Sequence, residues 1–516
     1  MSNQSYSRTR KSMRNSVVAL ILQFLAMLAG FFSRKIIIDC LGTEVVGLST
    51  TAASILGGLN LVESGIWSAI AVTLYKPLFD GDKQAVREIV ALHGWLYRIV
   101  AAIVMAGSVV VMIFFPQIFA KSELPLWYPY ATFGVLLYSS MLTLLVNYNR
   151  NALYADQQNY KVLLCARLIA LVKLICQAFA VYYSSNGYIW WLVLEAVFAT
   201  LGAFITRIVV YKSFPYLREK VSHPAELRFK YPQVLEKAKY LFFHKVGAYA
   251  VTQTSPLIIY GFASLSMVAL YGNYQILVLN LFSFMAALFS GLEASIGNLV
   301  AEGDRKLKMK VFGELLSSRM LIISVTALCL WLLADPLITV WLGPEYVMGK
   351  TTLIIIVISF FVGSCRGIIQ SFVDAHGDYR DIGAPLAEFV LNVGLSILGG
   401  WLWGLDGILA GAMLSQIIIG LLWKPFFLFR WVMKEPMWPF IRLFVRYLLL
   451  MGLVAGVVLL IIPHLSLHPS ASLVEFLLDA LIVFVICTAL MGGLLYLLDA
   501  NIRGFVSRII KTLGTK

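Results

Sequence analysis

Three cations lie inside long apolar stretches of this 516-residue chain: Lys173, Arg167 and Arg366. A cation at the centre of a bilayer-spanning helix costs roughly 2.5–3.5 kcal/mol on insertion scales, so it must face protein or a water-filled cavity. Lysine and arginine in such a cavity can bind anionic groups, and arginine does so through paired N–H donors. Arg34, at the outer end of the first apolar stretch, is a fourth candidate of this kind.

Carboxylates are buried in apolar stretches as well, at Glu63, Glu195, Glu293 and Glu388. Protonatable acids at this depth are candidate coupling sites for a proton or a sodium ion. Glu63 has polar neighbours on its helix and Glu388 lies one turn before Asn392, so these two acids are the predicted coupling residues. The alternative for all four is hydrogen bonding between helices, with Lys173 pairing with Glu195 across a hairpin.

Sequence signals for catalysis are absent from the chain. It holds neither a GxGxxG loop nor a Walker-type loop, and its six cysteines form no CxxC pair. The longest polar segment, residues 211–240, carries no acidic pair suited to glycosyl transfer. We therefore expect no enzyme activity, no metal and no cofactor other than a coupled proton or sodium ion.

The elements that must position these residues follow from composition. The chain is 60% hydrophobic and 13% charged, with a mean hydropathy of +0.83, whereas soluble domains are roughly 45–50% apolar and 25% charged. Its apolar runs are long and unbroken, which indicates membrane helices rather than an outer-membrane barrel. About fourteen spans are predicted, at residues 15–36, 45–78, 94–115, 128–149, 160–184, 188–211, 240–262, 267–300, 316–334, 351–372, 381–400, 405–430, 440–462 and 473–498.

The net charge of +14 is explained by the orientation of the chain in the membrane. With the N-terminus in the cytoplasm, four of the 41 lysines and arginines fall in outer loops and three within spans, which leaves 34 on the cytoplasmic side. This asymmetry fits the positive-inside rule and places both termini in the cytoplasm. The charge therefore predicts no nucleic-acid partner.

The chain repeats itself at an offset of about 220 residues. Landmarks in both halves recur in one order, at Gly81-Asp82-Lys83 and Gly303-Asp304-Arg305, Arg98 and Arg319, Pro116 and Pro336, Tyr160 and Tyr379, and Gly187 and Gly407. Six spans fit within the offset, so the copies are parallel. The predicted division is an N-lobe at 1–211, a cytoplasmic linker at 212–239, a C-lobe at 240–431, and two further helices with a cytoplasmic tail at 432–516. The repeated arginines, Arg98 and Arg319, each precede an apolar run and are predicted to be interfacial anchors.

The segment Arg34-Lys35-Ile36-Ile37-Ile38, followed by LGTEVVGL at 41–48 and LVESGIWSAIAVTLYKPL at 61–78, resembles Wzx-type polysaccharide flippases. These belong to the superfamily of multidrug, oligosaccharidyl-lipid and polysaccharide exporters. The plan of two six-helix lobes plus two trailing helices is similar to the branch of that superfamily that contains the lipid II flippases. The resemblance covers essentially the whole chain.

What the resemblance implies is the movement of an undecaprenyl-pyrophosphate-linked oligosaccharide from the inner to the outer leaflet by alternating access, for O-antigen, capsule or exopolysaccharide assembly. Lys173, Arg167, Arg366 and Arg34 would then contact the pyrophosphate. Expected partners are that lipid-linked oligosaccharide, membrane lipids and the polysaccharide polymerase machinery, in a bacterial cytoplasmic membrane. The alternatives are a multidrug–cation antiporter on the same fold and a lipid II flippase.

Overall fold

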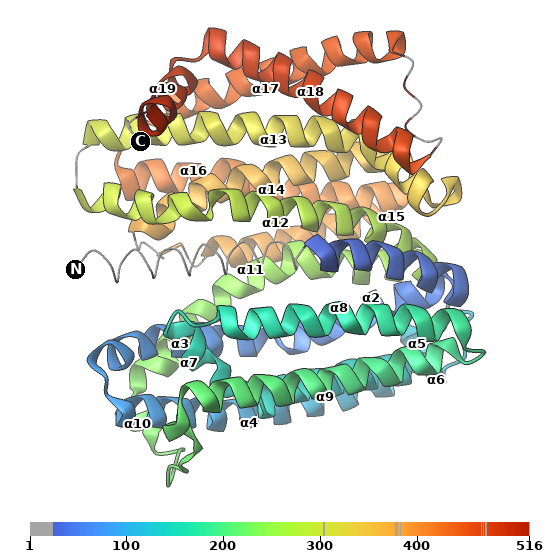
Figure 1. Cartoon of the computed structure of the whole chain (residues 1–516), viewed down its shortest axis with the longest axis vertical. Helices are drawn as coiled ribbons and strands as arrows, with labels where there is room; N and C mark the ends of the chain where they lie inside the picture. The colour runs from blue at the N-terminus through green and yellow to red at the C-terminus, as the bar shows by residue number, and fades with distance from the viewer. Residues whose placement is uncertain are drawn as a thin grey trace. The chain divides into compact units, whose positions relative to one another are not determined.

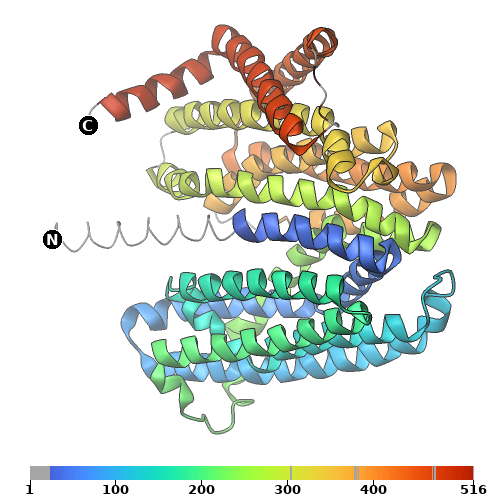
Figure 2. The same cartoon turned by 45° about the vertical axis from the view of Figure 1, so that its right-hand side comes forward.

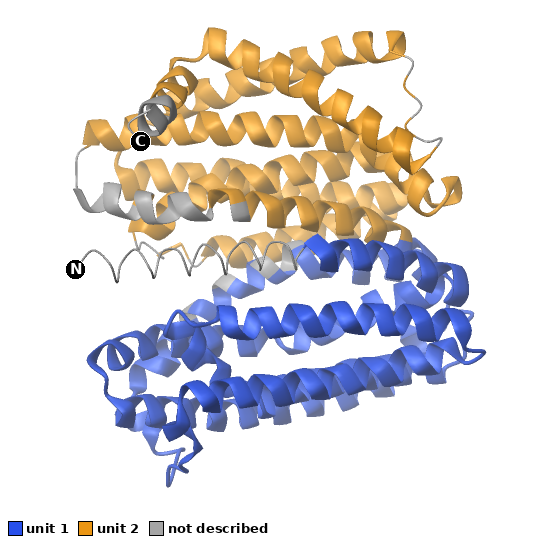
Figure 3. Cartoon of the chain, in the orientation of Figure 1, with its two compact units in different colours: residues 1–269 blue, residues 270–516 orange. Residues whose placement is uncertain are grey.

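The computed structural model describes residues 24–302, 305–376, 380–381, 383–465, 467, 469 and 472–514. It divides into two compact units, residues 1–269 and 270–516 (Figure 3). Several predicted features lie outside the described residues, namely the start of the first span at 15–23, the repeat landmarks Gly303, Asp304 and Tyr379, and the side chain of Glu293.

Unit 1 consists of helices joined by short connections. A first helix covers residues 24–41. It is followed by α2 (Thr43–Leu59), α3 (Leu61–Asp80), α4 (Lys83–Ile113), α5 (Phe115–Ile118), α6 (Trp127–Leu145), α7 (Asn151–Ala155), α8 (Tyr160–Tyr183), α9 (Gly187–Ser213), α10 (Leu227–Lys230) and α11 (Pro232–Phe262). Helix α12 (Leu265–Glu302) begins in unit 1 and continues into unit 2.

Unit 2 is also helical over its described residues. It contains α13 (Arg305–Trp341), α14 (Lys350–His376), α15 (Gly383–Gln416), α16 (Lys424–Phe427), α17 (Trp438–Ile461), α18 (Leu473–Leu498) and α19 (Ala500–Gly514). Two π-helical stretches, Ile417–Trp423 and Leu428–Met433, flank α16. Figures 1 and 2 show the helices of this unit from two directions.

The described part of the chain has nine helices long and apolar enough to cross a membrane, or up to eleven when two bent pairs are counted as spans. The bends are 55° between α2 and α3 and 54° between α6 and the segment Tyr148–Ala155. The expectation of an all-α polytopic membrane protein is confirmed.

One of the nine segments, Gly383–Met433, is a hairpin of two arms. Backbone angles leave the helical range at Trp403 and Gly404, where Gly404 has a φ of +58° that favours glycine. The arms touch through glycines, because a Cβ on Gly407 would lie 1.9 Å from the carbonyl oxygen of Gly399. The two predicted spans at 381–400 and 405–430 coincide with these arms.

Helix α11 packs on α3 and α2 within unit 1. A Cβ on Gly65 of α3 would lie 2.8 Å from the carbonyl oxygen of Ala238, and the Tyr249 hydroxyl donates to the Ser54 carbonyl at 2.9 Å. The compact units therefore divide at 269/270 rather than at the predicted linker. The predicted lobes rest on the repeat and not on contacts, and their boundaries stay a prediction.

The linker after α9 is held on the N-terminal end of α4. Glu88 accepts hydrogen bonds from Lys230 and from the Tyr231 hydroxyl, both at 2.7 Å. Burial and the hydrogen bond to Glu88 raise the pKa of Tyr231, so its hydroxyl keeps the proton that it donates.

The two helices that trail the predicted repeat pack on unit 2. Helix α18 lies along α13 and α17 lies beside α18 (Figure 1). Buried polar groups join them, since Ser317 of α13 donates to Asp499 at 2.7 Å and the Tyr447 hydroxyl of α17 also donates to Asp499. This cluster fixes the trailing pair at a defined register on α13.

Candidate functional site

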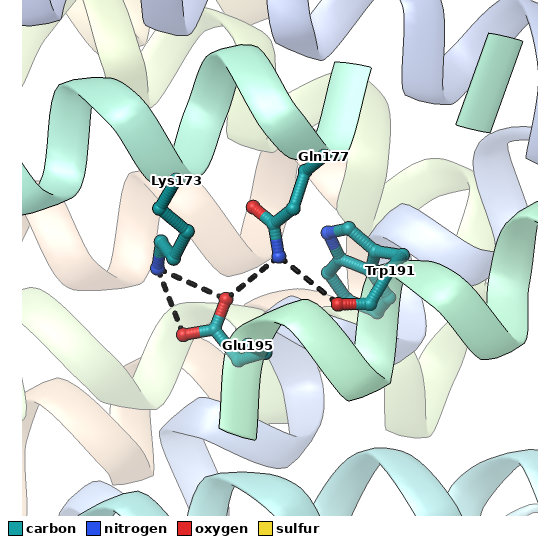
Figure 4. Close-up of polar contacts among 4 residues, drawn as sticks. All are labelled: Lys173, Gln177, Trp191 and Glu195. Carbon is teal, nitrogen blue, oxygen red and sulfur yellow. Dashed lines mark hydrogen bonds and ion pairs between the residues drawn. The ribbon is translucent and has the colours of Figure 1, made fainter. Parts of the chain in front are cut away.

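Lys173 of α8 pairs with Glu195 of α9 inside unit 1 (Figure 4). Its Nζ lies 2.8 and 2.9 Å from the two carboxylate oxygens. Gln177, one turn along α8, donates to Glu195 and to the backbone carbonyl of Trp191, each at 3.0 Å. The Lys173 side chain is 25% exposed and that of Glu195 is 21% exposed. This geometry agrees with the structural alternative given above, in which Lys173 pairs with Glu195 between two consecutive helices.

The other two candidate cations of unit 1 lie apart from that pair. Arg167 is exposed on α8 and has neither an ion pair nor a hydrogen bond among the described residues. Arg34 is half-buried and donates to the backbone carbonyl of Ala269 at 3.1 Å. The structure therefore does not gather Lys173, Arg167 and Arg34 around one point in unit 1.

In unit 2, Arg366 of α14 forms an ion pair with Glu388 of α15. Glu388 is fully buried, whereas the Arg366 side chain is 26% exposed. The second carboxylate oxygen of Glu388 has no partner in the described part of the chain. A residue predicted to bind substrate thus contacts a residue predicted to couple an ion.

Asn392, the polar neighbour predicted for Glu388, donates to the Ser415 hydroxyl at 3.2 Å across the hairpin. These two residues follow Lys173 and Glu195 by 219 and 220 positions, which is the repeat offset. The same inter-helix contact is therefore ionic in one half of the chain and neutral in the other.

A buried ion pair near Glu388 escapes the sequence analysis. Lys424 and Asp381 lie 3.0 Å apart and each side chain is 4% exposed. Trp423 donates its indole N–H to Asp381 at 2.9 Å. The sequence groups Lys424 with the cytoplasmic cations, although its position inside the predicted span 405–430 was the signal that could have singled it out.

Glu63 of α3 lies in a polar and aromatic cluster of unit 1. The Tyr97 hydroxyl donates to it at 3.2 Å. The fully buried His93 packs edge-on against Tyr97, with ring centroids 4.1 Å apart. Arg150 lies over the Trp67 ring at 5.5 Å. Of this cluster, sequence reasoning found only Glu63, because His93 and Arg150 fall outside the apolar cores of the predicted spans.

The repeated arginines differ in environment. Arg98 is exposed and its Nε donates to the carbonyl of Gly94 on its own helix at 3.1 Å. Arg319 is only 5% exposed. Burial of Arg319 differs from the exposed side chain expected of an interfacial anchor, and its depth in the bilayer stays a prediction.

Among the described residues, no group of three or more metal-ligating side chains lies close enough to hold an ion. Instead, the acidic side chains at these sites lie in contact with basic side chains or hydroxyl groups of the same unit. Each buried acid of these clusters contacts a basic side chain or a hydroxyl, an arrangement that can exchange a proton or release a cation when an anion arrives.

No family model matches this chain, and no curated protein matches it. Several solved structures are similar to it. The lipid II flippase MurJ, in an inward closed conformation, has a TM-score of 0.65 at 12% identity, covering 93% of this chain and 99% of that one. An inward-facing multidrug resistance MATE family transporter of the MOP superfamily has 0.54 at 11% identity, covering 79% and 97%. A Vibrio cholerae MATE transporter has 0.50 at 13% identity, covering 81% and 99%. The chain is an all-α polytopic membrane protein with the fold shared by these transporters.

Proposed function

We propose that the chain is a transporter that flips an undecaprenyl-pyrophosphate-linked oligosaccharide from the inner to the outer leaflet by alternating access. The observation that carries the proposal is coverage. The MurJ structure matches 93% of the chain, whereas the two MATE structures match 79% and 81%. The likeness to a protein named for flipping a lipid-linked substrate thus extends over more of the chain than the likeness to multidrug transporters.

The charges of the described spans support an anionic substrate. Three acids are matched by three cations, in the pairs Lys173–Glu195, Arg366–Glu388 and Lys424–Asp381. Outside these pairs, Arg167 is a further cation and Glu63 a further acid, so the cations and acids of this set are equal in number and show no excess of acid. A cavity for cationic drugs would carry a net excess of acid, so the multidrug–cation antiporter is the second candidate, and it rests on the MATE likeness alone.

For binding, we propose Arg167, Arg34 and Lys173 in unit 1 and Arg366 in unit 2 as separate contacts of the pyrophosphate along its path, not as one gathered site. To bind phosphate, Lys173 and Arg366 must either keep their ion pairs with Glu195 and Glu388 or break them. A phosphate that draws Arg366 away leaves Glu388 buried and uncompensated, which is costly unless the carboxylate takes up a proton. Glu388, together with Glu63 in unit 1, is thereby our candidate for coupling transport to a proton or sodium gradient.

The proposed setting is a bacterial cytoplasmic membrane with both termini in the cytoplasm. In that setting the product would pass to a polysaccharide polymerase on the outer face, and the chain itself would perform no catalysis. A lipid II flippase would use the same cationic groups on the same pyrophosphate and differs only in the glycan.

The test is flipping by the purified chain in proteoliposomes. Three fluorescent probes are compared: an undecaprenyl-pyrophosphate-linked oligosaccharide, lipid II and a lipophilic cationic dye. We expect transfer of the first probe between leaflets. Transfer of lipid II alone would reassign the glycan, and dye export without movement of either lipid would establish the antiporter and refute the flippase.

A further inference from the structure

A pocket of about 210 Å³ opens in unit 2 between α12, α13 and α14, and neither Arg366 nor Glu388 is part of its lining. Arg319 contributes a guanidinium to its lining, Phe289 an aromatic ring, and Ser364 and Ser371 two hydroxyls. None of the residues predicted from the sequence to bind substrate or to couple an ion lines this pocket.

Arg319 is held in the wall of the pocket. Its guanidinium carbon lies 4.4 Å from the centroid of the Phe289 ring, and its Nη1 is 3.5 Å from the Ser371 hydroxyl. With 5% of the residue exposed, the charge is nearly withdrawn from solvent yet adjoins an open volume. Its repeat counterpart Arg98 is exposed, so burial of this arginine is particular to the second copy.

The α14 wall of the pocket is built from small residues. Gly363 and Gly367 lie one turn apart in the lining, and a Cβ on Gly367 would meet no atom within 4 Å. The Ser364 hydroxyl is buried and has no hydrogen-bond partner in the described part of the chain. An unpartnered buried hydroxyl beside a guanidinium is suited to an oxygen-rich group that accepts hydrogen bonds.

We propose that this pocket binds the phosphate headgroup of a lipid. Arginine presents paired donors that match phosphate oxygens, and the serine hydroxyls add two more. The volume is below the roughly 300–1,000 Å³ of pockets that enclose whole drug-sized ligands, so a headgroup fits and a glycan does not. Arg319 stands immediately before the apolar run that starts at Met320, which places the phosphate where a hydrocarbon chain can follow α13 into the bilayer.

Two sources could supply this headgroup, the pyrophosphate of a polyprenyl-linked substrate or the phosphate of a bilayer phospholipid. The first deepens the proposed function and rests on it, as a loading site separate from Arg366. The second would make the pocket a lipid-dependent structural site. The chemistry at Arg319 is the same in both cases.

The test is native mass spectrometry of the full chain in detergent, with added undecaprenyl pyrophosphate, neutral undecaprenol, phosphatidylglycerol or inorganic pyrophosphate. We expect Arg319→Gln to weaken undecaprenyl pyrophosphate binding about 10- to 100-fold, as for the loss of a charge-assisted contact. The matched control Arg98→Gln removes the repeat-related cation and should leave undecaprenyl pyrophosphate binding unchanged. Binding of neutral undecaprenol should be unchanged in both Arg319→Gln and Arg98→Gln.

A second variant keeps the test decisive if Arg319→Gln does not fold. Gly367→Leu fills the pocket and retains the arginine, and the space beside Gly367 predicts that it folds. If Arg319→Gln and Gly367→Leu lose phosphatidylglycerol binding, a bilayer phospholipid is the source of the headgroup. If inorganic pyrophosphate binding depends on Arg319, the headgroup alone is enough for binding. Binding of all four probes equal to the unmodified chain, in both variants, overturns the proposal.

Failure of the site and failure of the proposed function give different results. If the chain flips the lipid-linked oligosaccharide but binds it independently of Arg319, the pocket assignment falls and the function stands. If binding depends on Arg319 and no lipid is flipped, the site stands and the flippase proposal falls.

Discussion

At the scale of single residues, the charges inside the described spans are mostly paired. Lys173 with Glu195, Arg366 with Glu388, and Lys424 with Asp381 each join neighbouring segments of one unit. Breaking such a pair by removing one partner leaves the other charge desolvated, and removing both is much less costly. This asymmetry separates a residue that stabilises the fold from one that binds substrate.

For Lys173, we expect the single variants Lys173→Gln and Glu195→Gln to lower thermal stability, and the double variant to recover part of it. The coupling free energy should be about 0.5–3 kcal/mol, as for residues in direct contact. If Lys173 also binds pyrophosphate, flipping stays impaired in the double variant because the cation is still missing. Recovery of flipping together with stability would reduce Lys173 to a structural partner.

For Glu388, we expect Glu388→Gln to retain lipid binding and to abolish the response of flipping to an imposed pH gradient. The amide has the shape of the carboxyl group but cannot exchange a proton. Flipping in proteoliposomes with and without the gradient measures this. Glu475→Gln, an exposed acid at the start of α18, is the matched control and should keep the response. A gradient response that survives Glu388→Gln excludes this acid as the coupling group.

Sequence reasoning identified most of these charges and offered one pairing, Lys173 with Glu195, as an alternative, but it did not find the other two pairs. The depth of Lys173, Arg366 and Glu388 follows from hydropathy, because an ionisable residue stands out in an apolar run. Whether Arg366 meets Glu388 depends on the rotation of α14 and α15 about their axes, which the apolar run does not specify. His93 was missed for the complementary reason, since it lies just before the predicted span 94–115, where polar residues carry no signal, whereas Lys424 lies inside the predicted span 405–430 and was overlooked.

At the scale of elements, glycine contacts and bends shape the helices. The hairpin of α15 turns at Gly404, and its arms meet at Gly399 and Gly407 with their backbones in contact. Such small-residue contacts replace the hydrophobic drive that water gives to soluble proteins. The approach of Gly65 to the backbone of α11 is a second example.

We expect Gly407→Ala to destabilise the protein by about 1–3 kcal/mol, as for overpacking of a close contact. Its Cβ would lie 1.9 Å from the Gly399 carbonyl oxygen, so the arms must separate. Gly394→Ala, on the other arm of the same hairpin, is the control, since its Cβ would meet no atom within 4 Å. Thermal unfolding in detergent compares the two, and equal stability of both variants would contradict the close contact.

Element existence was predictable and element shape was not. Each of the fourteen predicted spans is mostly helical over its described residues, and nine to eleven candidate spans are long and apolar enough to cross a membrane, because twenty apolar residues without breakers have few other options in a bilayer. The 55° bend after Leu59 fell inside one predicted span. Helix α4 begins at Lys83 rather than at residue 94, because its first turns are polar and lie outside the apolar window.

At the scale of the whole molecule, the charge distribution predicts the sidedness of the loops. The loop at Lys350 is expected outside and the linker at Lys220 inside. Both side chains are exposed. Lys350→Cys should therefore react with a membrane-impermeant thiol reagent in intact cells, and Lys220→Cys should react only after permeabilisation. Both belong on a Cys40→Ser background, because Cys40 is also exposed. The reverse labelling pattern would invert the topology.

The repeat-related contacts Lys173–Glu195 and Asn392–Ser415 make the two halves of the duplicated plan mechanically unequal. Dissolved salt screens an ionic contact but leaves an amide–hydroxyl bond almost untouched. Salt that reaches this partly buried pair should therefore weaken the contact between α8 and α9, by less than it would weaken an exposed pair, and leave the Asn392–Ser415 contact unchanged. The neutral Asn392–Ser415 contact serves as an internal reference, against which the salt sensitivity of the Lys173–Glu195 contact can be measured in the same protein.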